Sequence, residues 1–260
     1  MIGEEPYRWL EAIQNRREYI EDQLRPAKPV FAVAGGPGIL LCAVSASPKL
    51  FEVYDHLALA GLGHPADLER VRQSAIDAAH VEGFTRSRAD VGARRLANYT
   101  LAPAMKAAFE QIFAAPLLFR GVLAELGETP AEDSAWTLDY DGSFEAAAPE
   151  ELARGLLLSG RNRVNQGWTE LADKPAAGDT LKALAGHALR ALAWAQASGD
   201  GSPRAAWKDL PKTNAEALKI LGTPPAFALL DRARRNRIAY RVPGAAELGL
   251  SPGKRKTAGK

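Results

Sequence analysis

The apolar stretch from Val30 to Val44 constrains the fold of this chain most. It is the longest apolar stretch in the sequence, and the residues Gly35-Gly36-Pro37-Gly38 divide it into the runs VFAVA and ILLCAV. Two short apolar runs separated by such turn residues predict a β-hairpin. The stretch is too short and too broken to cross a bilayer as a helix, so we expect no membrane contact.

Composition narrows the function classes. The chain has 260 residues, and 33 basic residues nearly balance 31 acidic ones, which does not favour nucleic-acid binding as the main role. The single cysteine, Cys42, excludes an intrachain disulfide and a thiolate zinc site. The polar N-terminus has no apolar signal core, so we expect a cytoplasmic protein.

The remaining pattern alternates strands with pairs of helices. Apolar residues at helical spacing predict a first helix, which Pro26 and Pro29 end. Pro65 opens a second helix, and Ser87 with Asp90 predicts the start of a third, which Pro103 interrupts. The predicted helices are 6–24, 65–84, 87–112, 163–171 and 179–197, and the predicted strands are 30–34, 39–44, 51–54, 57–62, 117–126, 135–141, 227–230 and 238–242.

This order indicates an α/β sandwich with layered sheets. We expect a single domain over residues 1–246, a surface loop over 198–210 and a basic disordered tail over 247–260. No internal repeat is present.

Several segments, in order, resemble proteasome α-type subunits. They are NRREYIEDQLRPAKPVFAV, PKLFEVYDHLALAGLGHPADLERVR, EGFTRSRADVGARRLANY, VLAELG, LDYDGSF and AFALLDRARRNRIAYRV, and together they run from about Arg8 to Val242. The third is similar to a helix of actinobacterial α subunits. The chain lacks the Tyr-Asp-Arg segment and the Ser-Pro-Asp-Gly turn that precede the first helix in archaeal and eukaryotic members.

The resemblance implies the N-terminal-nucleophile hydrolase fold. This is a four-layer αββα sandwich with two stacked antiparallel sheets flanked by helices, plus an α-type N-terminal helix. It also implies a heptameric homo-oligomeric ring that stacks on catalytic β-type subunits, admits unfolded protein substrates and receives the C-terminal tails of an ATPase activator.

Peptidases of this fold use a Thr, Ser or Cys at the first residue of the mature chain, with its own amine as the base. That position falls at Lys28-Pro29, where neither residue supplies a hydroxyl or thiol. Removal of Met1 would expose Ile2, which is no nucleophile, and Cys42 lies in an apolar strand typical of a buried structural cysteine. We therefore expect no catalytic residues, no metal site and no cofactor.

The resemblance assigns roles to surface residues instead. Lys49 matches the lysine that meets the activator's terminal carboxylate, Gly63 matches the glycine of the docking pocket, and Glu18 matches a glutamate linked to gating. On the first helix, Trp9, Ile13 and Ile20 are candidates for the contact between neighbouring subunits.

Two alternatives remain open. One is an active homo-oligomeric peptidase related to the proteasome, and the other is a ring-forming scaffold that works without a separate β subunit.

Overall fold

The computed structural model describes residues 5–45, 47–171, 180–198 and 210–250 of the chain. The helices of these residues are α1 (Glu5–Leu24), α2 (Pro65–Thr85), α3 (Ala93–Leu96), α4 (Ala102–Glu110), α5 (Pro149–Arg154), α6 (Asn162–Leu171), α7 (Leu181–Ala197) and α8 (Asn214–Leu221). The strands are β1 (Val30–Gly35), β2 (Gly38–Val44), β3 (Leu50–Tyr54), β4 (Leu57–Gly63), β5 (Phe119–Glu125), β6 (Ser134–Asp139), β7 (Phe144–Ala147), β8 (Leu156–Leu158), β9 (Pro225–Asp231) and β10 (Tyr240–Arg241).

The strands form two five-stranded sheets, in the orders β10-β9-β2-β1-β8 and β3-β4-β5-β6-β7, and every strand pairing within them is antiparallel. The predicted hairpin is β1–β2, with Gly35 opposite Gly38. Gly38 has φ +131°, and a Cβ there would lie 1.9 Å from the Leu230 carbonyl oxygen, so only glycine fits this turn.

Alternation along β1 and β2 explains why these runs are apolar throughout. Phe31 and Val33 face one core, shared with α7 and α8, whereas Val30 and Ala32 face the other sheet. Since successive side chains of a strand point to opposite faces, a strand buried on both faces must be continuously apolar. The hairpin is therefore an inner element of the sandwich.

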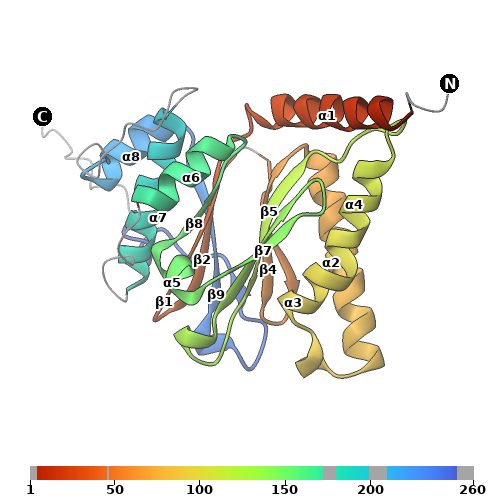
Figure 1. Cartoon of the computed structure of the whole chain (residues 1–260). Helices are drawn as coiled ribbons and strands as arrows, with labels where there is room; N and C mark the ends of the chain where they lie inside the picture. The colour runs from red at the N-terminus through yellow and green to blue at the C-terminus, as the bar shows by residue number, and fades with distance from the viewer. Residues whose placement is uncertain (1–4, 46, 172–179, 199–209, 251–260) are drawn as a thin grey trace, which may run out of the picture.

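Helices cover the outer face of each sheet, which confirms the predicted four-layer αββα sandwich (Figure 1). One outer layer contains α6, α7 and α8, the other contains α2, α3 and α4, and a separate core fills each of the three spaces between layers. Helix α1 lies across one end of the two sheets (Figure 1). In the residues that the structure describes, no helix combines the length and the apolarity needed to cross a membrane.

The third helix begins later than predicted. Ser87 Oγ donates to the Asp90 carboxylate instead of capping a backbone N–H, so the segment Arg88–Asp90 forms only one 3-10 turn, and α3 begins after Gly92. The predicted interruption near Pro103 is confirmed. Residues Ala97–Leu101 form a π-helical turn immediately before α4, where the proline nitrogen has no hydrogen to donate.

Sequence reasoning missed β7, β8, α5 and α8. The first three are too short for periodicity to reveal them, and β7 is largely exposed. The predicted start of the tail at residue 247 is also wrong, because Leu248 is buried in the core beside α7. The predicted loop over 198–210 and the rest of the predicted tail fall largely or wholly outside the described residues.

Candidate functional site

The C-terminal half of α1 is anchored in the space between the two sheets. Ile20 is 1% exposed and Leu24 is fully buried, and both belong to the inter-sheet core. Ile20 was predicted to contact a neighbouring subunit because it is apolar at helical spacing. That prediction is corrected: Ile20 packs against its own chain and presents no surface to a neighbour.

Arg16 fixes the middle of α1 to the end of α4. Its guanidinium donates to the carbonyl oxygens of Ala108, Ile112 and Ala114 at 3.1, 3.1 and 2.9 Å. A cation is favourable at a helix C-terminus, where carbonyl groups lack intrahelical partners. On the N-terminal side of Arg16, the rest of the chain covers less of the helix. Trp9 is 51% exposed there and Ile13 is partly buried.

A second polar cluster joins α1 to both sheets through Arg120. This guanidinium is 2% exposed and donates to Asp139 at 2.9 Å, to Glu21 of α1 at 3.0 Å and to the Ser159 carbonyl oxygen at 3.1 Å. The Tyr140 hydroxyl also donates to Glu21, at 2.9 Å. Burial, and then the bond to Glu21, raise the pKa of Tyr140, which keeps its hydroxyl a donor. The cluster locks α1 onto the strand ends.

Lys49 is buried, at 6% exposure, just before β3. Its Nζ donates to the Lys28 carbonyl oxygen at 2.6 Å, at the junction between α1 and β1. Burial, and then the charge of Lys28, lower the pKa of Lys49 to about 8. No carboxylate among the described residues pairs with this ammonium, so it is a desolvated cation without a counter-ion inside the described chain.

Gly63 lies at the same end of the β3–β4 hairpin as Lys49. The Gly61 N–H donates to the Lys49 carbonyl oxygen at 2.9 Å, and Gly63 follows two residues later with φ +134°. A Cβ at Gly63 would lie 1.9 Å from the Leu118 carbonyl oxygen. The fold itself therefore requires glycine at this position.

Glu18 lies on the exposed side of α1, where its carboxylate accepts a hydrogen bond from Gln14 at 3.0 Å. No hydrogen bond or ion pair in the described part of the chain joins Glu18 to Lys49. The structure thus brings Lys49 and Gly63 to one hairpin end and leaves Glu18 on the helix surface.

The start of β1 lies in the interior of the chain. Lys28 and Pro29 continue upstream into α1, whose last residue, Leu24, is fully buried. Cys42 is also fully buried, and burial raises the pKa of its thiol well above the ordinary value. Within the described ranges, no group of three His, Cys, Asp or Glu side chains is placed to hold a metal ion.

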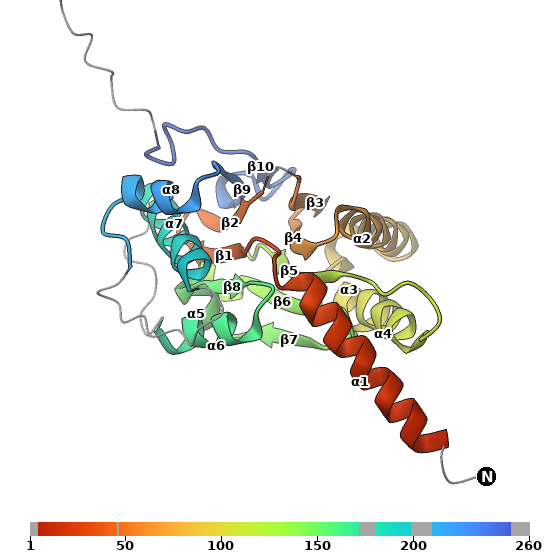
Figure 2. The ribbon, with the colours of Figure 1, turned by 90° about the horizontal axis from the view of Figure 1, so that it is seen from above.

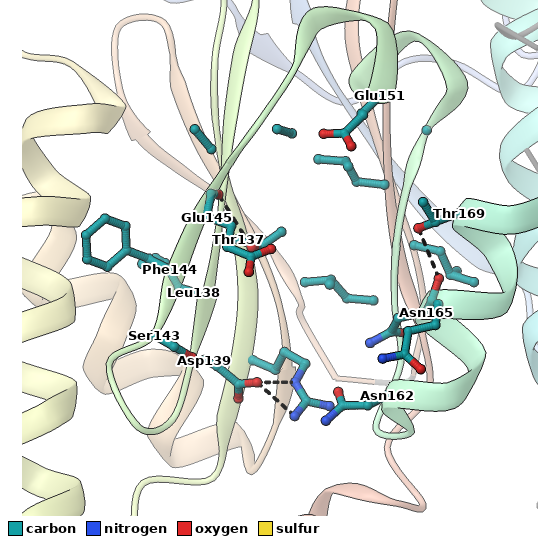
Figure 3. Close-up of a pocket in the computed structure, with 18 of the residues that line it drawn as sticks. Thr137, Leu138, Asp139, Ser143, Phe144, Glu145, Glu151, Asn162, Asn165 and Thr169 are labelled. Atoms are coloured by element: carbon teal, nitrogen blue, oxygen red, sulfur yellow. Dashed lines mark hydrogen bonds and ion pairs between the residues drawn. The ribbon is translucent and has the colours of Figure 1, made fainter. Parts of the chain in front are cut away.

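A slot of about 450 Å³ separates β7, at the edge of one sheet, from β8, at the edge of the other (Figure 3). Helix α5 closes one end with Glu151 and Arg154, and the Arg120–Asp139 pair closes the end nearer α1. The walls carry Thr137, Leu138, Phe144, Glu145, Leu156, Asn162, Asn165, Gln166 and Thr169.

Arg16, Arg120 and the slot were not predicted. Arg120 had a usable signal, since it is the one cation within the otherwise apolar segment from Leu117 to Ala124. A charge inside a strand that must be buried requires a partner. The slot had no such signal, because it is formed by strands too short to be predicted.

Comparisons with known proteins agree on one kind of relative. No protein-family model matches the chain. The chain is 30% identical over 244 residues to the proteasome subunit alpha of Saccharopolyspora erythraea, which covers 92% of this chain and 84% of that protein. It is 30% identical over 247 residues to the proteasome subunit alpha of Kineococcus radiotolerans, with 93% and 94% covered. The corresponding protein of Saccharomonospora viridis is 28% identical over 243 residues.

Proposed function

Because this chain belongs to the family of proteasome α subunits, we propose that it is a non-catalytic subunit that forms a ring and gates a proteasome-like complex. The ring docks an ATPase activator, stacks on catalytic β subunits in the cytoplasm and admits unfolded substrate to them. A heptamer is the ring size expected for the family.

The observation that carries the non-catalytic role is the interior position of the β1 start. An N-terminal nucleophile needs a free α-amine beside its hydroxyl or thiol. Here Lys28 occupies that position, its carbonyl oxygen is bonded to Lys49, and the preceding helix is anchored by Ile20 and Leu24. Freeing an amine at this point would require cutting the chain between two packed elements.

The test is peptide hydrolysis by the purified chain, alone and after co-expression with a proteasome β subunit. We expect no hydrolysis by the chain alone, and an intact mass that retains residues 5–29. Hydrolysis appears only with the β subunit. Activity of the chain alone that is blocked by an inhibitor of N-terminal threonine peptidases would refute the proposal.

The role of α1 in ring formation needs a carefully placed truncation. Removing residues 1–24 would also remove Ile20 and Leu24 from the inter-sheet core, so the loss of rings would report misfolding. Removal of residues 1–14 retains Arg16 and the buried half of the helix while it deletes Trp9 and Ile13. We expect this shorter deletion to yield folded, smaller particles by light scattering, and rings of unchanged size would remove α1 from the contact.

Activator docking at Lys49 is supported by its burial without a carboxylate partner in the described chain. A terminal carboxylate from outside would supply the missing charge, and a charge-assisted bond in a desolvated place is strong. Gly63 lies at the same hairpin end, and Glu18 completes the proposed docking and gating set from the surface of α1.

The alternative of a ring that works without a β subunit differs in one measurable respect. If the chain works without a β subunit, the addition of β subunits leaves the height of its particles in electron micrographs unchanged. A stacked particle of greater height favours the gating role.

A further inference from the structure

We propose that the slot between β7 and β8 binds an extended segment of a separate, unfolded polypeptide as an additional strand, with a preference for basic side chains. The site lies at the opposite edge of the sandwich from Lys49, and it can be tested independently of the proposed ring and gate. We call the edge formed by β7 and β8 the open edge, and the edge formed by β3 and β10 the closed edge.

The backbone of β7 has hydrogen-bonding groups on its free side. Where β6 turns into β7, the Asp139 N–H donates to the Ser143 carbonyl oxygen at 2.9 Å. Because hydrogen-bonded and non-hydrogen-bonded pairs alternate along an antiparallel ladder, Phe144 and Ala146 direct their N–H and C=O groups away from β6. No hydrogen bond from the described part of the chain reaches these groups. β7 can therefore pair with one more strand.

The spacing of the two sheets suits a strand between their edges. Stacked sheets lie about 10 Å apart, and hydrogen-bonded strands lie about 4.8 Å apart. A strand placed midway between β7 and β8 would therefore lie at hydrogen-bonding distance from both. The slot volume of about 450 Å³ is within the range of ligand pockets. β7 has 4 residues and β8 has 3, so the paired segment is about as short.

The closed edge does not offer this space. The Ala239 N–H donates to the Asp55 carbonyl oxygen at 2.8 Å, and the Tyr240 hydroxyl donates to the Leu50 carbonyl oxygen at 3.1 Å. These bonds join β10 to β3 across the two sheets. Of the two edges, the open edge is therefore the one that can receive a strand, and the closed edge serves as its internal control.

Polar side chains face the slot from both walls (Figure 3). Phe144 points away from the slot and contacts Trp136, with 6.0 Å between the ring centroids, so the next residue of the strand, Glu145, points toward the slot. Asn165 and Gln166 of α6 lie on the opposite wall, and Gln166 forms no side-chain hydrogen bond with a described residue. In the view from above, the slot opens at the edge of the sandwich where β7 lies (Figure 2).

Charge gives the slot a preference for a basic segment. Glu145 is exposed and forms no ion pair with a described residue. Arg120, at the end nearer α1, already has two carboxylate partners. Of the other charged residues that line the slot, Glu145 and Glu151 are acidic and Arg154 is basic. A lysine or arginine side chain on the bound segment would therefore meet more carboxylate than guanidinium charge.

The first test uses the full wild-type chain and a fluorescein-labelled peptide in which lysine alternates with valine. Fluorescence polarisation is expected to show saturable binding. Methylation of every second backbone nitrogen removes the donors on one side of the peptide, and we expect it to weaken binding about tenfold or more. A peptide with glutamate in place of lysine should also bind more weakly. Equal binding of the methylated peptide would show attraction by charge alone and would overturn the proposal.

Hydrogen exchange of the same complex locates the peptide. We expect the amides of Phe144 and Ala146 to become protected, and those of Tyr240 and Arg241 in the closed edge to remain unchanged. Protection confined to another part of the surface would place the peptide elsewhere. If the β7 amides are already protected without the peptide and do not change, part of the protein itself fills the slot. Either result contradicts the proposal.

Variants of β7 give a further check. Ala146→Pro removes an N–H that points away from β6, and edge strands tolerate proline at such a position, so we expect about tenfold weaker peptide binding by a chain that circular dichroism shows to be folded. Glu145→Gln should weaken binding about twofold to fivefold. Glu52→Gln, on the exposed side of β3, is the matched control and should change nothing. Unchanged binding in both β7 variants would overturn the site.

The outcomes separate this site from the proposed function. If the wild-type chain stacks on β subunits but shows no saturable peptide binding, the slot proposal is wrong and the gating role stands. If the chain binds the peptide at β7 but forms no particle with β subunits, the slot proposal stands and the gating role is wrong.

Discussion

At one edge of the sandwich β3 and β10 are hydrogen-bonded across the two sheets, whereas at the other edge β7 and β8 stand apart around a slot. Both edges end five-stranded sheets, so the same unpaired backbone groups arise at each. At the first edge the carbonyl oxygens of Leu50 and Asp55 accept hydrogen bonds from across the sheets, from the Tyr240 hydroxyl and the Ala239 N–H. At the second edge polar side chains, among them Gln166 and Thr169, line the slot. An edge left open in this way is suited to a partner.

The stability of the region around the slot between β7 and β8 is expected to depend most on Arg120, which closes the end of the slot nearer α1. We expect Arg120→Met to lower the free energy of unfolding by about 3–5 kcal/mol, because it leaves the Asp139 carboxylate partly buried without its counter-ion. Urea unfolding followed by circular dichroism measures this loss. Arg17→Met is the matched control, since Arg17 is exposed and pairs with Asp141 on the surface. Its expected cost is under about 1 kcal/mol, and equal costs for the two variants would contradict the anchoring role.

Lys49 lies at the α1 end of the closed edge, directly before β3. Lys49→Ala is expected to weaken binding of a peptide that copies an activator C-terminus by about 1.5–3 kcal/mol per site, roughly a tenfold to hundredfold loss in affinity. The rings should stay intact. Surface plasmon resonance measures the affinity, and Lys49→Arg, which keeps the charge and changes the donor geometry, should retain part of it.

The pH dependence of that binding is a sharper check. Since the pKa of Lys49 is lowered to about 8, the ammonium loses its proton as pH rises through 8. Wild-type affinity for the peptide should therefore decline above that pH, and the residual affinity of Lys49→Ala should not. If Lys49→Ala binds the peptide tightly at every pH, Lys49 has a structural role only and does not bind the activator.

The hydrogen bond that joins β10 to β3 is expected to contribute less to the free energy of unfolding than Arg120 does. Tyr240→Phe removes the bond to the Leu50 carbonyl oxygen and should lower the free energy of unfolding by about 1 kcal/mol. Hydrogen exchange should rise locally in β3 and β10 and remain unchanged in β7 and β8. An increase at the open edge instead would show that the two edges are not independent.

The smallest effect concerns His187, behind the open edge. Its Nε2 bonds the Arg154 carbonyl oxygen at 2.7 Å, and burial lowers its pKa. The unfolded imidazole gains a proton near pH 6.5, so below that pH the unfolded state binds more protons than the folded one. Stability should therefore be full above about pH 6.5 and fall as pH drops below it. His187→Gln should flatten the dependence of stability on pH, and His80→Gln is the control for removing an exposed histidine. If the pH dependence is unchanged in His187→Gln, another titratable group causes it.

The inner layers of this fold were predictable, because two physical rules acted on them at once. β1 and β2 are buried on both faces, so their sequences are continuously apolar, and the turn glycines mark where they reverse. Helix α1 likewise has a clear period and two prolines at its end. The prediction for Ile20 was wrong because periodicity shows that a helix face is apolar without showing whether the same chain or a neighbouring subunit covers it.

The sheet edge formed by β7 and β8 was not predictable from the sequence. β7 is four residues long and exposed, and β8 is three residues long, so neither has a distinctive pattern. The slot also depends on the pairing of β8 with β1, which lies far away in the sequence, whereas β7 pairs with its neighbour β6 as a hairpin. The burial of Lys49 likewise follows from the path of the α1–β1 junction, which no local sequence pattern reports.

The most direct test of the account is native mass spectrometry of the full chain with and without a proteasome β subunit. We predict a closed ring of identical copies whose mass rises by whole β rings when the β subunit is added. A monomer that ignores the β subunit, or a two-fold dimer in which like edges meet and growth stops, would contradict it.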